Sequence, residues 1–279
     1  MEKLIEILRQ FDVNRSQAIK DGKFINKSEQ EKYEVIAECF KPCAENILCN
    51  GYFLVNGKYI IDLGAIELYY HEENGDIKDP IMYHTNDTGS FSQFFKGKEL
   101  PYFKFGSFNL HEVGVDVTFE KDKDEITGEE KKYRASFLIR SYRAFEIKDV
   151  KELEKVDEIL NNTQKPHFDP HSKHIFDDMF PNGVFIGKDD EYKIEWKNCS
   201  KSDGIENCKR INVAEYEKKE ENEKKRYVKK LIEKEKYDAL PDADKCDYKY
   251  KGKVNNKTWY YKKESRNWGF KRIGINEHK

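Results

Sequence analysis

Two charged residues inside apolar segments are the first chemically suggestive feature of this sequence. Glu67 lies in the run KYIIDLGAIELYY, where most neighbours from Ile60 to Leu68 are apolar, and Arg140 lies in the apolar segment SFLIRSY. Apolar surroundings raise the pKa of a carboxyl group unless a cation pairs with it, and an unpaired buried guanidinium is costly. We therefore predict that Glu67 and Arg140 contact each other. The pair is either a catalytic base with its cation or a structural ion pair.

A second group of reactive side chains stands in the segment HFDPHSKHIFDD. It consists of His167, Asp169, His171, His174, Asp177 and Asp178. Imidazole and carboxylate groups are metal ligands, and a metal-dependent phosphoesterase built on them is one function that we consider. Their spacing matches no metal-binding motif, however, and the composition also suits a solvated loop. We predict the loop and assign no metal and no cofactor.

The absence of well-known motifs argues against several enzyme classes. The sequence has no G-x-S-x-G, no P-loop and no Rossmann glycine pattern, which argues against hydrolase triads, nucleotide kinases and dinucleotide-dependent enzymes. The cysteines form no C-x-x-C pair, and the first three lie in an apolar helical pattern. They are Cys39, Cys43, Cys49, Cys199, Cys208 and Cys246. We predict thiols rather than disulfides or zinc ligands.

The elements that must position these residues follow from periodicity. We expect helices over residues 1–20, after Ser28, over 149–160 and over 214–237, and strands over 51–55, 59–70, 102–105, 114–120 and 133–145. Ser28 with Glu31 forms a capping box, and Asn56-Gly57 is a hairpin turn. This order predicts an α+β fold with a mixed, mainly antiparallel sheet flanked by helices. We expect a single domain over 1–279, with its core at about 28–212 and a charged helical and aromatic extension over 213–279.

Composition and hydropathy indicate the cellular location that we expect for this protein. The chain has 279 residues, 37% of them charged, a net charge of -2 and a mean hydropathy of -0.94. No apolar run approaches the ~20 residues that cross a bilayer, and the charged start MEKLIEILRQFD lacks the apolar region of a signal peptide. We therefore predict a cytoplasmic monomer with no membrane partner.

Short motifs spread along the first half of the chain resemble one enzyme family. In order they are I-E-L-Y, a D-P and a His, Y-x-x-F-G, V-D-V-T and L-I-R, within roughly residues 35–146. They are similar to the motifs E-x-E-A-Y, D and S-H, M-F-x-G-x-x-Y-V-Y-x-x-Y-G, N-V or N-I-S, and L-I-R-A of the methylpurine (3-methyladenine) DNA glycosylase family. The resemblance implies that family's curved sheet and a function in DNA repair by base excision.

The resemblance also implies a reaction. Glu67 would be the general base that activates the water attacking the sugar carbon of a flipped nucleotide, and Arg140 would hold that water and the carboxylate. The chain would then be a monofunctional glycosylase that hydrolyses an N-glycosidic bond without a metal or a covalent lysine intermediate. Its partner would be double-stranded DNA that contains a damaged base.

Aromatic residues would form the binding pocket. By the resemblance, Tyr69 and His84 are the two walls that stack on the extruded base, Tyr102 is a further pocket aromatic, and Phe105 is the wedge that fills the gap in the duplex. His111 lies between Phe105 and the V-D-V-T motif in sequence. It is either a pocket residue or a structural histidine at a strand end.

The sequence also departs from the family pattern. Asp116 replaces the asparagine that rejects guanine-type bases, so base specificity does not carry over. The insert HEENGDIKD places His84 17 residues after Glu67, and the basic residues that follow the family's histidine are missing. Because phosphate contacts depend on such cations, a non-catalytic module that binds a nucleobase, nucleic acid or protein on the same fold is the alternative function.

Overall fold

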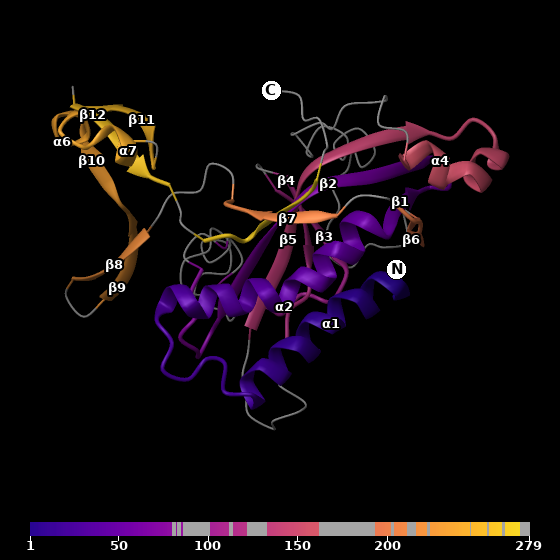
Figure 1. Cartoon of the computed structure of the whole chain (residues 1–279), viewed down its shortest axis with the longest axis horizontal. Helices are drawn as coiled ribbons and strands as arrows, with labels where there is room; N and C mark the ends of the chain where they lie inside the picture. The colour runs from indigo at the N-terminus through magenta and orange to yellow at the C-terminus, as the bar shows by residue number, and fades with distance from the viewer. Residues whose placement is uncertain are drawn as a thin grey trace.

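The computed structural model has an α+β fold in which an antiparallel sheet carries two long helices on one face (Figure 1). The described residues are 1–79, 82, 85, 101–111, 114–121, 133–161, 193–201, 204–210, 216–221, 224–245, 247–255, 257–263 and 266–273. A smaller group of strands and short helices stands apart from this main body. The predicted fold class is confirmed at this level, while the glycosylase fold stays a prediction.

The two long helices are α1 (Glu2–Lys20) and α2 (Glu29–Cys49), which lie side by side (Figure 1). The predicted capping box starts α2, because the Ser28 hydroxyl accepts from the Glu31 backbone N–H and the Glu31 side chain accepts from the Ser28 N–H. Their apolar sides, with Leu8, Phe11 and Phe40, are fully buried against the sheet.

The main sheet has eight strands in the order β3-β4-β5-β2-β1-β6, and β13 pairs with β2 and β7. Every pairing is antiparallel. The central strands β2 and β5 pair over their whole length. The strands are β1 (Gly51–Val55), β2 (Tyr59–Glu72), β3 (Ser107–His111), β4 (Gly114–Thr118), β5 (Tyr133–Glu146), β6 (Ile194–Asn198), β7 (Ile205–Cys208) and β13 (Gly269–Arg272).

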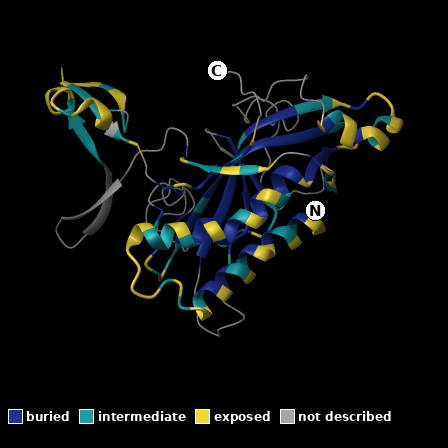
Figure 2. Cartoon of the chain, in the orientation of Figure 1, coloured by how far each residue is buried: buried dark blue, intermediate teal, exposed yellow. Residues whose placement is uncertain are grey.

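The two faces of this sheet differ in chemistry. One face meets the helices through rings, with Phe40 stacked on Phe119 at a centroid distance of 5.6 Å and Phe11 edge-on to Phe119 at 5.4 Å. Strand side chains alternate, and a register shift between Leu63 and Ile66 in the β2–β5 pairing displaces this alternation by one residue. The residues that do not face the helices therefore point to the other face, which we call the polar face. It carries Asp62, Glu67, Tyr69, His71, Asp116, Arg134, Arg140 and Arg143. Figure 2 shows that the central strands are largely buried.

Residues 216–263 form a smaller lobe. β8 (Tyr216–Glu221) pairs with β9 (Lys224–Lys229), and β10 (Leu231–Glu233), β12 (Lys257–Lys262) and β11 (Tyr248–Val254) form a three-stranded sheet with the short helices α6 (Lys234–Asp238) and α7 (Asp242–Lys245). The predicted helix over 214–237 is wrong over most of its length. Its alternating charges also match across two strands, since the register sets Glu220 opposite Lys225 and Glu221 opposite Lys224.

The chain then returns to the main sheet through β13, where Trp268 and Phe270 are fully buried. The lobe is therefore an insertion between two paired strands, β7 and β13, and the predicted extension over 213–279 does not hold for residues 266–273. The predicted helix over 149–160 is present as a 3₁₀ helix, η1 (Val150–Lys155), and α4 (Val156–Asn161). In the described part of the chain, no helix has the length and apolarity needed to span a membrane.

Candidate active site

The Glu67 carboxylate and the Arg140 guanidinium meet on the polar face. The β2–β5 register sets Glu67 opposite Leu138, and Arg140 follows two residues further along β5. Arg140 Nε lies 3.0 Å from Glu67 Oε1. The Glu67 side chain is 2% exposed and the Arg140 side chain 19%, and the Arg140 Nε atom that contacts Glu67 is itself buried. The predicted contact is present, and it offsets the cost of burying the carboxylate.

Tyr69 completes the surroundings of Glu67. Its hydroxyl donates to Glu67 Oε2 over 3.2 Å, and the Arg210 guanidinium carbon lies 4.5 Å from the centre of its ring. Burial, followed by the negative charge of Glu67, raises the pKa of Tyr69 well above its usual value, so the phenol stays protonated and remains a donor. The ring is half-buried beside the carboxylate, and its role as a wall of a base-binding pocket stays a prediction.

A row of residues in register crosses the sheet at the level of Glu67. Gly269 on β13, Glu67, Leu138, Asp116 on β4 and Asn109 on β3 are successive cross-strand partners. Two strand spacings separate Glu67 from Asp116, about 10 Å. Asp116 therefore shares the face with Glu67, and the negative charges of both carboxylates act on Tyr69.

Two buried polar atoms near this row have no hydrogen-bond partner among the described residues. They are Asn109 Nδ2 and Ser136 Oγ. Asn109 is the register partner of Asp116, and Ser136 is the partner of Tyr69. Buried polar atoms normally bind protein, water or ligand, so this face offers a donor and a hydroxyl to a polar molecule.

Arg210 holds the outer side of Tyr69 and was not predicted from the sequence. It forms two hydrogen bonds to the buried Asp79, at 2.7 and 3.2 Å, and its guanidinium also lies 5.2 Å from the Trp268 ring centre. Arg266 contacts Asp79 at 3.6 Å. Its guanidinium carbon lies 4.9 Å from the ring centre of Trp268 and 4.7 Å from that of Tyr33. In the sequence, residues 259–272, WYYKKESRNWGFKR, interleave aromatic and basic residues. This composition is the local signal that could have pointed to Arg266 and Trp268.

The charge of Asp79 is fixed by these two arginines. Burial alone would raise the pKa of its carboxyl group, but Arg210 and then Arg266 outweigh burial and lower it. Arg210 precedes the lobe and Arg266 follows it. The Asp79 carboxylate therefore binds both chain segments that connect the lobe to the main sheet.

Tyr102 lies on the Arg134 side of this face. The Arg134 guanidinium is 4.1 Å from the Tyr102 ring centre, and it pairs with Glu120 at 3.0 Å. Arg134 is the register partner of His71, four residues along β2 from Glu67. The described contacts of Tyr102 are thus with Arg134, and they do not place its ring against Glu67.

Phe105 does not lie on the polar face. Its ring centre is 6.3 Å from that of Phe119, and it packs against the helix-side core. The following Gly106 has a φ of 77° and lies against Ile5 of α1, which directs this segment toward the helix. The proposed role of Phe105 as a wedge is therefore wrong in this structure.

The predicted histidine sites are placed only in part. His84 and the cluster from His167 to Asp178 lie outside the described residues. His111 ends β3 opposite Gly114, but its side chain is not among those described. Within the described part, no group of three or more His, Cys, Asp and Glu residues is arranged to hold a metal ion.

The cysteines that the structure describes are free thiols, and Cys39, Cys43 and Cys49 are buried on α2. Burial raises the pKa of Cys39 to about 11 and that of Cys43 to about 12. A thiol with such a pKa has little nucleophilic thiolate at neutral pH. Cys39 and Cys43 therefore fit the predicted structural role.

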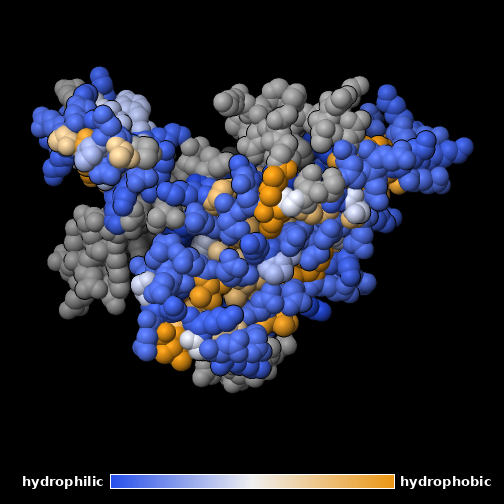
Figure 3. Space-filling model, viewed as in Figure 1, coloured by the Kyte–Doolittle hydropathy of each residue, from blue (hydrophilic) through white to orange (hydrophobic). Residues whose placement is uncertain are grey.

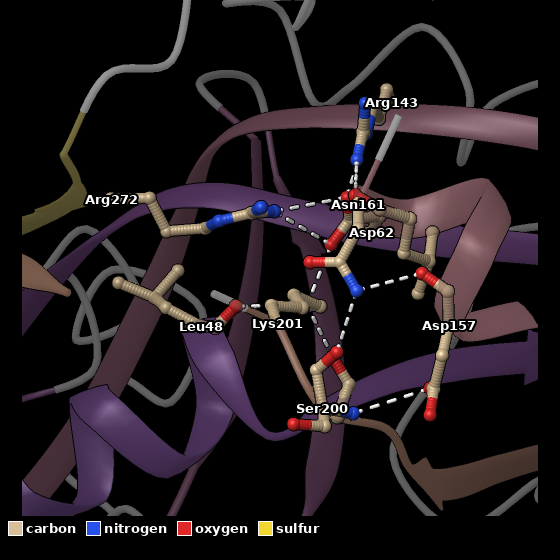
Figure 4. A network of polar contacts seen from close by, with 10 residues as sticks. Leu48, Asp62, Arg143, Asp157, Asn161, Ser200, Lys201 and Arg272 are labelled. Carbon is tan, nitrogen blue, oxygen red and sulfur yellow. Dashed lines mark hydrogen bonds and ion pairs between the residues drawn. The ribbon is translucent and has the colours of Figure 1, made fainter. Parts of the chain in front are cut away.

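A second buried charge network on the polar face is structural (Figure 4). Lys201, Arg143 and Arg272 contact the fully buried Asp62 carboxylate at 2.6, 2.7 and 3.0 Å. Lys201 Nζ also donates to the backbone carbonyls of Leu48 and Gly51 at 2.8 and 2.7 Å. Because its donors come from β5, β13 and the segment after β6, this network joins distant parts of the chain.

No family model, curated protein or solved structure matches this chain. What the site can do is therefore read from its own groups. A buried carboxylate held by the Arg140 guanidinium and the Tyr69 phenol, near the buried Asn109 and Ser136 side chains, can orient a water molecule and take a proton from it.

Proposed function

We propose that this protein is a DNA glycosylase that removes a damaged or modified base by hydrolysing its N-glycosidic bond. The observation that carries the proposal is the Glu67 carboxylate, which is buried between the Arg140 guanidinium and the Tyr69 hydroxyl. A carboxylate placed in this way can orient one water molecule, and burial shields the reaction from bulk solvent.

The proposed chemistry needs one base and one water. Glu67 accepts a proton from the water as the water oxygen forms a bond to the sugar carbon. The bond from that carbon to the base nitrogen breaks, and its electron pair leaves with the base. Arg140 holds the carboxylate in place through the contact of 3.0 Å between its Nε and Glu67 Oε1.

Base recognition would use the ring and the polar atoms beside it. Tyr69 offers a stacking surface, and its ring is held from the outer side by Arg210. Asn109 Nδ2 and Ser136 Oγ, buried on the same face, offer hydrogen bonds to the edge of an extruded base. Stacking and edge contacts together offset the cost of taking a base out of the helix, which is a few kcal/mol.

The test is the Glu67→Gln variant, which keeps the shape of the side chain and removes the base. We expect release of hypoxanthine or 3-methyladenine from duplex oligonucleotides to fall by about 100-fold or more, which is the usual contribution of a general base. Folding should be preserved, as judged by circular dichroism. Glu146→Gln is the matched control, because Glu146 ends β5 and forms an exposed pair with Lys58. Release by Glu67→Gln at the wild-type rate rejects the proposal.

One observation favours a second function, a binding module without chemistry. Both oxygens of Glu67 are engaged, Oε1 by Arg140 and Oε2 by Tyr69, so fewer of its lone pairs are left to hold a water molecule. Asp116 in place of the family's asparagine also alters base recognition. In that case lesion-containing DNA would bind to the wild type and to Glu67→Gln with no release by either, which the same assay separates from catalysis.

A further inference from the structure

The hairpin formed by β11 and β12 concentrates positive charge. Residues 248–263, which we call the lysine hairpin, contain six lysines and no aspartate or glutamate, although the whole chain has a net charge of -2. The acidic residues of the lobe come earlier in the sequence. Asp238 and Asp242 pair with Lys234 and Lys245 of the short helices, and Glu233 pairs with Lys257 of the hairpin, whereas Lys251 and Lys253 are exposed. The hairpin is therefore a local cationic surface on a slightly acidic molecule.

Tyrosine rings lie between these lysines. The register sets Tyr250 opposite Tyr260, and Tyr260 stacks on Tyr237 of α6 at a centroid distance of 3.8 Å and an interplanar angle of 2°. Tyr250 is edge-on to Tyr260 at 5.9 Å and is 54% exposed. The Tyr250 ring is thus held in place by Tyr260 and still exposes part of its surface to solvent.

Lysines lie on both faces of the lysine hairpin, around the Tyr250 ring. Lys253 pairs in register with Thr258 and lies on the tyrosine face, whereas Lys249 pairs with Tyr261 and lies on the opposite face. Lys251 stands at the register shift between Tyr250 and Gly252, and both Lys251 and Lys253 are exposed. A flexible polyanion can therefore contact the lysine hairpin along its edge and over the face that carries Tyr250 and Tyr260.

We propose that the lysine hairpin binds single-stranded nucleic acid, with the lysines on phosphates and Tyr250 stacked on a base. Alternating cations and exposed rings are the pattern by which proteins bind single strands without sequence preference. An anionic membrane fits less well, because Val254 at the tip is the one exposed aliphatic residue among the described side chains of the hairpin. Figure 3 shows a largely hydrophilic surface on this lobe. The inference does not depend on the chemistry at Glu67.

The experiment measures binding of a fluorescein-labelled 20-nucleotide oligo-dT to the full chain at several salt concentrations. In the Lys251→Gln/Lys253→Gln variant we expect a clear loss of affinity. The slope of log affinity against log salt should also fall by about 1.4, since each phosphate contact to a single strand contributes about 0.7. The Lys20→Gln/Lys23→Gln variant is the control, because it removes the same charge from two exposed lysines of the main body.

A second pair of variants isolates the ring. Tyr250→Ala should weaken oligo-dT binding by about fivefold or more, and Tyr250→Phe should bind like the wild type, because stacking needs the ring and not the hydroxyl. Equal affinities for the two lysine variants, an unchanged salt slope, or a stronger effect on duplex DNA than on oligo-dT would overturn the proposal. So would hairpin-dependent binding to phosphatidylserine vesicles without binding to oligo-dT. Loss of oligo-dT binding with base release intact separates this proposal from the glycosylase proposal.

Discussion

At the scale of single residues, the polar face holds carboxylates in two different situations. Asp62 is fully buried and contacts three cations that belong to separate segments, so its charge is fully committed to structure. Glu67 is 2% exposed and pairs with Arg140, whose side chain is partly exposed. The difference explains why we assign chemistry to Glu67 and a structural role to Asp62.

Asp62→Asn should destabilise the fold strongly, because it leaves three buried cations without their carboxylate. Losing one partner of a buried ion pair costs about 3–5 kcal/mol. Urea unfolding at pH 7 measures this, with Asp76→Asn as the control, since Asp76 is 83% exposed in its pair with Lys32 and should change little. An Asp62→Asn protein as stable as the control would contradict the structural role.

The same residue predicts a pH dependence. Burial would raise the pKa of Asp62, but Lys201, Arg272 and Arg143 outweigh it and lower the pKa below 3.8 in the folded state. A lowered folded pKa stabilises the protein at every pH above the unfolded value, and this contribution is lost as pH falls below about 4. The wild type should therefore lose stability between about pH 4 and pH 2 more steeply than Asp62→Asn, as unfolding midpoints measured along a pH series will show.

At the scale of elements, close packing between neighbouring strands fixes where β6 sits. Trp196 of β6 lies over Gly51 of β1, and its ring is 4.8 Å from the ring of Phe53. A Cβ on Gly51 would lie 2.1 Å from the Trp196 ring, a distance that no real contact allows. Glycine is thus required at this position by its neighbour and not by its backbone conformation.

Gly51→Ala should destabilise the protein by about 1–3 kcal/mol, since the indole must move out of a packed core to admit the methyl group. Gly204→Ala is the control, because a Cβ there meets only Ile273 Cδ1 at an ordinary 3.5 Å. Chemical unfolding of both variants measures the difference, and tryptophan fluorescence reports whether Trp196 has moved. A Gly51→Ala protein of wild-type stability would show that the β1–β6 contact is looser than described.

At the scale of the whole molecule, the lobe is an insertion that adds little to the main core. Among the described side chains of residues 230–263, none is buried, whereas Trp268 and Phe270 beyond the insertion are fully buried. Arg210 and Arg266, at the two ends of the insertion, both contact Asp79. The main sheet therefore depends on the segment after the lobe more than on the lobe itself.

Replacing residues 213–263 by a short Gly-Ser linker should leave the main sheet folded, with an unfolding midpoint near that of the full chain. Truncation after residue 265 should instead unfold it, because Arg266, Trp268 and Phe270 would be lost. Near-ultraviolet circular dichroism, which reports the packing of tryptophan, distinguishes the two results. Unfolding of the linker variant would mean that the lobe supports the core.

Local signals in the sequence were enough to predict several elements. The Ser28–Glu31 capping box marks the start of α2, and Asn56-Gly57 forms the turn between β1 and β2 with φ values of 53° and 66°. The contact between Glu67 and Arg140 was also foreseeable, because each charge stands in an apolar strand and needs a partner. These features depend on neighbours in sequence or on the cost of one unpaired charge.

The remaining features depend on contacts between distant parts of the chain. The lobe's alternating charges fit a helix and a strand pair equally well, and cross-strand pairing selected β8 and β9. Arg210 and Trp268 reach Tyr69 and the core from more than 130 residues away, which no local pattern encodes. Phe105, expected from the sequence as a wedge, packs toward α1 and Phe119, and this direction depends on contacts that the sequence does not show. Sequence determines local conformation and the need for partners, whereas the choice among distant partners depends on how the strands pair.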